Sequence, residues 1–280
     1  MRSEGFSIPP NAEGKRIQVK PFNKQSFIIQ LTVAALAVLT VYGFISFDYK
    51  DVTFLGGLAA AFENFNIMFT EAHFVHFTFA EAVYQVLITI GLAALTTLFG
   101  AVIALFLGLF AARNLSNETV SAVIKGAVAF IRAVPTVLWV LIFAVAAGLG
   151  SVAAVIGMTF HSVGYLIKAY SESFEEMDEG VIEALRGSGA SFWHIVFQAV
   201  IPSTITYLIS WTFLRFEINF GVAVAMGAAA GAGGIGFDLF MASGFYFDLR
   251  EVGMITYFIL TFAILLELLA IRIKSNLRAR

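Results

Sequence analysis

The sequence predicts an all-α integral membrane protein with six transmembrane helices. Of its 280 residues, 59% are hydrophobic and only 13% are charged, whereas a soluble domain carries about 25% charged residues. The uncharged residues form long runs, and about 20 apolar residues are enough for a helix to cross a bilayer. Because the sequence contains no cysteine, disulfides, thiolate metal sites and cysteine nucleophiles are excluded.

The first span is expected at Phe27–Phe47, after a polar and basic head. A signal peptide would follow such a head with an apolar core of about 7–15 residues and a small-residue cleavage site. This run is longer, and at 1.5 Å per residue it covers about 30 Å, the thickness of the hydrocarbon core. We therefore expect a retained transmembrane helix.

Five further apolar runs predict the remaining spans. The third and fourth runs are separated by only a few residues, so they are expected to form a tight helical hairpin. The predicted spans are Val83–Ala112, Gly126–Gly148, Val152–Ala169, Ile195–Ala225 and Val252–Ile271.

The distribution of Lys and Arg predicts the orientation of these spans, because cytoplasmic loops are enriched in both. One side of the membrane would carry only Lys50 and Arg250. The other side would carry the basic amino-terminal head, the carboxy-terminal tail, and Arg113, Lys125, Lys168 and Arg186. Both termini are therefore expected in the cytoplasm.

The first outer loop, Asp48–Ala82, contains apolar side chains at helical spacing. Leu58, Phe62, Phe65 and Phe69 recur every three or four residues, which predicts an amphipathic helix. Such a helix either lies on the outer face of the membrane or packs against the other spans. His73 and His76 in this loop have a spacing compatible with a metal, but no third ligand is evident, so no metal site is predicted.

The segment of about 171–191 is a charged island between two spans, on the side predicted to be cytoplasmic. Ser173 and Glu176 fit a capping box, in which a helix start satisfies its own free amides. Val181 and Ile182 add a small apolar surface, and the glycines that follow are expected to end or bend the helix. We expect two short helical pieces that project from the membrane.

This segment resembles the cytoplasmic loop of importer-type ATP-binding-cassette (ABC) permeases. The matching residues are Glu183, Ala184, Leu185, Gly189, Ile201 and Pro202. Two positions depart from the pattern, since Ala is usual in place of Leu185 and Ile in place of Ala199. Leu185 and Ala199 are apolar like the residues they replace, so the docking surface is expected to keep its apolar character. By resemblance, the loop is the coupling helix that seats in a cleft of an ATPase subunit.

Four other motifs occur in the same order as in the permease subunit of phosphonate transporters. They are 132–136 (Arg-Ala-Val-Pro-Thr), 148–150 (Gly-Leu-Gly), 215–219 (Arg-Phe-Glu-Ile-Asn) and 231–237 (Gly-Ala-Gly-Gly-Ile-Gly-Phe). The similarity covers about Val83–Arg280. It implies a type I ABC importer permease fold in the inner membrane of a bacterium. Residues 83–280 would form the permease core, and residues 1–82 the amino terminus, first span and outer loop.

Arg215, Glu217 and Asn219 in the fifth span are the candidate residues of a substrate path. Ionisable groups within a membrane are costly and usually face a bundle interior or a water-filled path. Arg suits an oxyanion because its planar fork binds two oxygens at once. An ion pair with another span would explain Arg215 equally well. The permeases that this chain resembles tend to carry a second Arg at the position of Gly221. Because that positive charge is missing here, solutes other than a strongly anionic one remain alternatives.

A glycine-rich segment with Gly231, Gly233, Gly234 and Gly236 follows the fifth span, on the side predicted to be outer. It matches the dinucleotide fingerprint Gly-x-Gly-x-x-Gly. That fingerprint requires a preceding strand within a βαβ unit, which the predicted span excludes. The glycines are instead expected to permit close helix contacts or irregular backbone beside a water-filled cavity.

The resemblance implies a transport subunit rather than an enzyme, in an ATP-driven importer of phosphonate or related phosphorus oxyanions such as phosphate and phosphite. The sequence has no Gly-x-x-x-x-Gly-Lys-Ser/Thr motif, so two copies of a separate ATPase would bind ATP and Mg. An extracytoplasmic binding protein, membrane lipid and a second copy of this chain are the other expected partners, and nucleic acid is not one. The alternatives are an ABC permease for another small solute, such as an amino acid, and a stand-alone secondary transporter.

Overall fold

A computed structural model describes residues 23–47 and 53–278 of the chain, and every regular element in these ranges is helical. The chain divides into two compact units, Met1–Ala59 and Ala60–Arg280. The first unit contains α1 (Lys24–Ser46), and α2 (Phe54–Thr70) crosses the boundary. The second unit contains α3 (Phe79–Ala111), α4 (Glu118–Ala133), α5 (Thr136–Ala147), α6 (Ser151–Glu175), α7 (Glu179–Gly187), α8 (Phe192–Ile195), the π-helical turn η1 (Val196–Val200), α9 (Ile201–Ala230), α10 (Ile235–Gly244) and α11 (Leu249–Arg278).

The described helices confirm an all-α membrane protein. Five of them are long and apolar enough to cross a bilayer: α1, α3, α6, the continuous helix of α8, η1 and α9, and α11. The pair α4 and α5 would make a sixth span, but the two helices meet at a bend of 91°. The predicted span Gly126–Gly148 is therefore not one straight helix. Pro135 causes the break, because it has no amide donor and forces Val134 into extended backbone, at φ −91° and ψ 125°.

The helices α3, α6 and α9 form the centre of the second unit, and small residues let them approach closely. Gly100 and Gly108 of α3 face Ser162 and Tyr170 of α6, where an added Cβ would lie within 3.2 Å of those side chains. Gly157 of α6 faces the backbone of Val140 in α5 in the same way. Small residues at helix crossings are typical of membrane bundles, which gain stability from close packing rather than from the hydrophobic effect.

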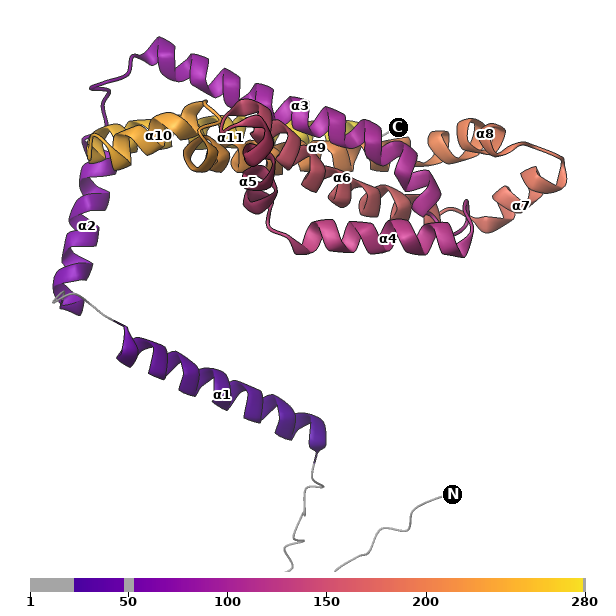
Figure 1. Ribbon diagram of the computed structural model, residues 1–280, viewed down its shortest axis with the longest axis horizontal. Helices are drawn as coiled ribbons and strands as arrows, with labels where there is room; N and C mark the ends of the chain where they lie inside the picture. The colour runs from indigo at the N-terminus through magenta and orange to yellow at the C-terminus, as the bar shows by residue number, and fades with distance from the viewer. Residues whose placement is uncertain (1–22, 48–52, 279–280) are drawn as a thin grey trace, which may run out of the picture. The chain divides into compact units, whose positions relative to one another are not determined.

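The two ends of this unit differ (Figure 1). The α7 end is the end at which α7 and α8 lie, and the α10 end is the opposite one. At the α10 end the chain reverses after α9 through glycines with positive φ: Gly231 at 61°, Gly233 at 79° and Gly234 at 75°. Gly236 then faces the carbonyl of Val224 so closely that a Cβ would collide with it. The irregular backbone and the close contact that the glycine pattern predicted are both present, whereas the water-filled cavity beside them stays a prediction.

The helix predicted in the first outer loop is confirmed as α2. Its carboxy-terminal part packs against α11, since the ring of Phe69 meets that of Tyr257 at 5.7 Å and the Tyr257 hydroxyl donates a hydrogen bond to the Phe69 carbonyl. Beyond α2, the fully buried Glu251 carboxylate accepts hydrogen bonds from the amides of Val75, His76 and Phe77. The His76 ring lies 2.8 Å from the same carboxylate, so this histidine serves a structural contact.

Candidate functional site

The segment predicted to dock on an ATPase folds as the short helix α7, followed by a turn and α8. The helix begins after Asp178, whose side chain accepts a hydrogen bond from the amide of Gly180. The predicted capping box at Ser173 is wrong. The helix α6 continues through Ser173 to Glu175, and the Ser173 hydroxyl donates within that helix to the carbonyl of Ala169, which is the competing use of a serine side chain.

The turn after α7 explains the requirement for Gly189. The amide of Ala190 donates back to the carbonyl of Leu185, and Gly189 has φ +85°. This is the usual left-handed end of a helix, and a residue with a Cβ is strained there. A glycine at this place is therefore dictated by the backbone.

The predicted docking residues divide between an exposed face and an anchor. Glu183, Ala184 and Gly189 are exposed, whereas Leu185 is partly buried against the core. Ile182 anchors the opposite side of α7, with only 2% of its surface exposed. Pro202 lies apart from α7, in the first turn of α9 just after the π-helical turn.

The loop between α3 and α4 holds the helix α7 to the bundle. The guanidinium of Arg186 donates to the carbonyl of Asn114 at 2.9 Å. The side-chain amide of Asn114 in turn donates to the carbonyl of Phe174 at 2.7 Å. The orientation of α7 therefore depends on this loop and, through it, on α6.

Glu175, the last residue of α6, reinforces this connection. Its carboxylate accepts a hydrogen bond from the amide of Arg113 at 2.8 Å and pairs with Lys125 of α4 at 2.7 Å. We call Arg113, Asn114, Lys125, Glu175 and Arg186 the latch. Nothing in the local sequence pattern indicates it, because its members come from four separate segments.

Of the three candidate path residues, the structure brings two together. Arg215 is buried, with 3% of its surface exposed, and its Nε donates to the Ser162 hydroxyl at 3.0 Å. Its guanidinium also lies 5.1 Å from the centre of the Tyr165 ring. The side-chain amide of Asn219 donates to the hydroxyls of Ser162 and Thr97. Arg215 and Asn219 thus belong to one polar cluster between α3, α6 and α9.

Arg215 has no carboxylate partner among the residues that the structure describes, and its Nη2 is buried without a hydrogen bond. The alternative of an ion pair with another span is not seen within these residues. Glu217 lies on another side of α9, is partly exposed, and has no ion pair in the same described ranges. Residues two apart on a helix point in different directions, which accounts for the separation.

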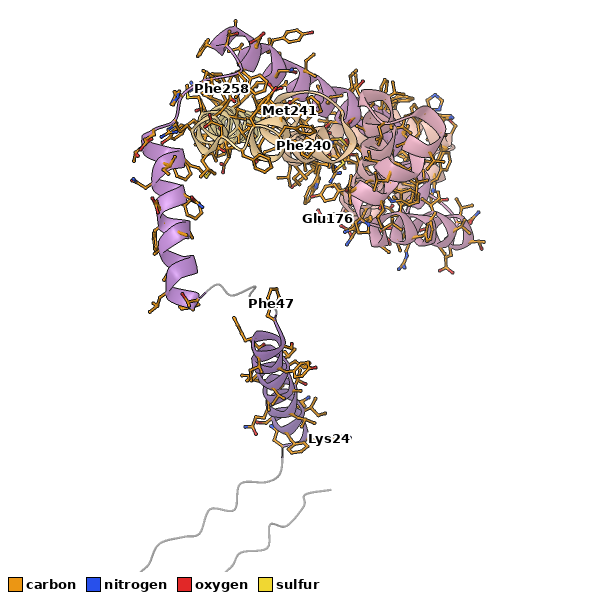
Figure 2. All side chains as sticks on the ribbon, turned by 60° about the vertical axis from the view of Figure 1, so that its left-hand side comes forward. Lys24, Phe47, Glu176, Phe240, Met241 and Phe258 are labelled. Atoms are coloured by element: carbon orange, nitrogen blue, oxygen red, sulfur yellow. The ribbon has the colours of Figure 1, made fainter. Side chains whose placement is uncertain are left out.

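A groove of about 770 Å³ lies between α6 and α9 and extends toward the α7 end. Hydroxyl groups line the α9 side at Ser203, Thr206, Tyr207 and Ser210. Two carboxylates of α6, Glu172 and Glu176, lie at one end of it. Within the second unit, Glu176 lies well apart from Phe258 (Figure 2). Sequence reasoning missed the groove, although the hydroxyls recur at the i, i+3, i+4, i+7 spacing of one helix face.

Helices long enough to span a bilayer, polar groups buried between them and a short exposed helix at one end define a multi-span membrane protein with a polar interior. The chain belongs to the family of binding-protein-dependent transport system inner membrane components, whose pattern matches residues 104–280. The matched region includes α7, the groove and all of the polar cluster except Thr97.

Two curated relatives show where this chain lies within the family. It is 33% identical over 190 residues to the phosphate-import permease protein PhnE of Mycolicibacterium smegmatis (strain ATCC 700084 / mc(2)155), a match that covers 68% of this chain and 35% of that protein. It is 32% identical over 180 residues to the phosphite transport system permease protein PtxC of Stutzerimonas stutzeri, covering 64% and 65%. The chain thus spans about one third and just under two thirds of their lengths.

Among solved structures, the chain resembles an inward-facing conformation of the MetNI methionine ABC transporter. The TM-score is 0.62 at 21% identity, and the match covers 70% of this chain and 95% of that one. At this identity the similarity shows the fold, which is that of a type I ABC importer permease.

Proposed function

We propose that this chain is the permease subunit of an ATP-driven importer of phosphonate or a related phosphorus oxyanion, such as phosphate or phosphite. The family match and the names of the two relatives support this proposal. The observation that carries the mechanism is the helix α7, which exposes Glu183 and Ala184 while Arg186 binds the loop between α3 and α4 and Ile182 packs into the core of the bundle.

In this proposal α7 is the coupling helix, and Glu183, Ala184, Leu185, Gly189 and Pro202 form or support its contact with an ATPase subunit. A short helix held firmly to packed spans transmits a rigid-body movement of the ATPase into the membrane. ATP and Mg are bound by the ATPase, so this chain holds no cofactor of its own. Two ATPase copies require two docking sites, which a symmetric homodimer of this chain provides.

A binding protein delivers the solute on the side of the α10 end, and both termini lie in the cytoplasm. We further propose that Arg215, Glu217 and Asn219 contribute polar groups to the path, and that the segment from Gly231 to Gly236 forms its outer boundary. Arg215 supports this because a buried guanidinium that has no carboxylate partner in the described part of the chain is suited to an oxyanion. Specificity resides mainly in the binding protein, so the path itself binds weakly.

Reconstitution of the complex tests the function. Proteoliposomes that contain this chain, its ATPase and its binding protein should take up radiolabelled phosphate, phosphite or methylphosphonate in an ATP-dependent manner. Methionine serves as the comparison solute, because an amino-acid permease is the alternative. Uptake of methionine without uptake of any phosphorus oxyanion would overturn the proposal.

The variant Gly189→Val tests the coupling assignment in the same system. Valine cannot adopt the left-handed backbone without strain, so the turn after α7 is distorted and uptake should be abolished, while membrane insertion remains intact. Gly126→Ala in α4 is the matched control, because a Cβ at that position meets nothing within 4 Å. Unchanged uptake by Gly189→Val at normal expression would show that α7 is not the coupling helix.

A further inference from the structure

The helix α10 buries a carboxyl group at the place where it packs against α3. Asp238, in the first turn of α10, has only 3% of its surface exposed. Its Oδ1 accepts one long hydrogen bond, at 3.4 Å, from the side-chain amide of Gln85 in α3. Its Oδ2 is buried and has no hydrogen-bond partner among the described residues. An ionised carboxylate has about four acceptor sites to satisfy, so this environment suits the neutral acid better.

Close contacts on two sides fix the start of α10 around this carboxyl group. The Thr89 hydroxyl of α3 accepts a hydrogen bond from the amide of Ile235 at 3.0 Å, and a Cβ added to Gly234 would collide with the same hydroxyl. On the other side, Gly236 lies against the carbonyl of Val224 in α9. Because both neighbouring helices are in contact, α10 has to shift before water can surround the Asp238 carboxylate.

The helices that pack against α10 place only acidic charge near Asp238. Glu81 of α3 and Glu251 of α11 act on it, and the neighbouring part of α9, residues 218–230, contains no ionisable side chain. Asp238 forms no ion pair within the described residues, and the His76 ring contacts Glu251 instead. Burial, with the negative charge of both glutamates, raises the pKa of Asp238 to about 6. The helix α10 is too short to be among the candidate spans.

We propose that Asp238 is a proton-binding site that controls how tightly α10 packs against α3 and α9. With its proton, the carboxyl group is neutral and remains buried. Loss of the proton leaves a charge that the buried position does not stabilise, so α10 shifts until water reaches the carboxylate. The ligand is a proton from the side of the membrane at the α10 end. The site is independent of which solute the protein transports.

The pH dependence of unfolding tests the site in the purified full-length chain. Because folding raises the pKa of Asp238 from 3.8 to about 6, the bound proton contributes stability that is complete below the lower value and is lost as the pH rises through the higher one. Between about pH 5 and about pH 8 this loss is a roughly tenfold decrease in the folding equilibrium constant. Asp238→Asn, which is neutral at every pH, should not show it, so its unfolding temperature should exceed that of the parent increasingly as the pH rises.

His76→Gln is the control for this measurement, because histidine side chains as a class change charge near neutral pH. The variant should keep the pH dependence of the parent, since the His76 ring contacts Glu251 and not Asp238. A difference between the parent and Asp238→Asn that stays constant with pH would overturn the proton site. So would a pH dependence that disappears in His76→Gln alone.

The absence of cysteine from the sequence allows the movement of α10 to be measured by thiol labelling. Ala242→Cys places a thiol at a fully buried position of α10. At about pH 8 a maleimide should label it several-fold faster when Asp238 is present than when Asp238→Asn is added, because only the ionised carboxylate loosens the helix. Ser243→Cys, at the exposed neighbouring position, should react equally in both backgrounds. Equal labelling of Ala242→Cys in both backgrounds would show that ionisation does not move α10.

Discussion

At the scale of single residues, Arg215 poses the sharpest energetic problem in the molecule. A buried guanidinium in a membrane bundle is costly unless it is paired or hydrated. Here it has one hydroxyl and one aromatic ring as partners, and one nitrogen remains without a hydrogen bond. The remaining demand for an acceptor is consistent with transient contact to an anion or to water in the path.

We predict that Arg215→Ala impairs transport far more than assembly. The reason is that Ser162 keeps its hydrogen bonds to Asn219 when the guanidinium is removed, so the helix contacts survive. Both the yield of intact complex and the substrate-stimulated ATP hydrolysis should be measured, with Arg132→Ala, at an exposed arginine of α4, as the control. Loss of the complex would show that Arg215 is a structural charge.

The residue patterns predicted some of the site and missed the rest. Spacing on α9 correctly separates Arg215 from Glu217, because helix geometry alone decides it. The start of α7 was placed incorrectly, because Ser173 can bond either to a free amide or to its own helix, and only the length of α6 decides between them. The latch could not be predicted from the sequence, because its residues lie far apart along the chain and meet only through tertiary packing.

At the scale of elements, the helix α7 depends on contacts at its base. Glu175 and Lys125 are partly exposed, at 27% and 32%, and an ion pair of this kind contributes at most about 1 kcal/mol. That energy is about a fivefold change in a local equilibrium. The latch therefore adjusts the position of α7 rather than holding the fold.

Glu175→Gln should weaken this connection without unfolding the protein. We expect fewer solute molecules imported per ATP hydrolysed, by about fivefold at most, because α7 moves less closely with α4 and α6. The ratio of uptake to ATP hydrolysis in proteoliposomes measures this effect, and Glu118→Gln is the control. An unchanged ratio would show that Arg186 and Asn114 suffice.

Most helices could be predicted from apolar runs, because a helix that crosses the hydrocarbon core needs about 20 apolar residues. Pro135 indicates a bend between α4 and α5. A hydropathy average over about 20 residues is hardly changed by a single proline, so it predicts one continuous span. The fifth span proved longer than the predicted Ile195–Ala225, extending from Phe192 to Ala230. The additional residues are 192–194 (Phe-Trp-His) at one end and 226–230 (Met-Gly-Ala-Ala-Ala) at the other. Helix boundaries are the part of a sequence pattern that is least well defined.

At the scale of the whole molecule, the asymmetry of Lys and Arg predicts both termini in the cytoplasm. A reporter fused after Arg280 should therefore behave as cytoplasmic, and one inserted near Glu63 as external. The reason is that basic loops are retained on the inner side during insertion. An external carboxy terminus would mean that the bent pair α4 and α5 does not cross the membrane.

The length of the helix that ends in α9 has a mechanical consequence. From Phe192 to Ala230 it runs for 39 residues without interruption, or about 58 Å at 1.5 Å per residue. A rod of this length acts as a lever arm. If the helix tilts by about 6° about a pivot at its α8 end, the other end moves by about 6 Å, which is close to the pitch of one helical turn. A small change of tilt imposed at one end of this helix would therefore move its other end by several ångströms.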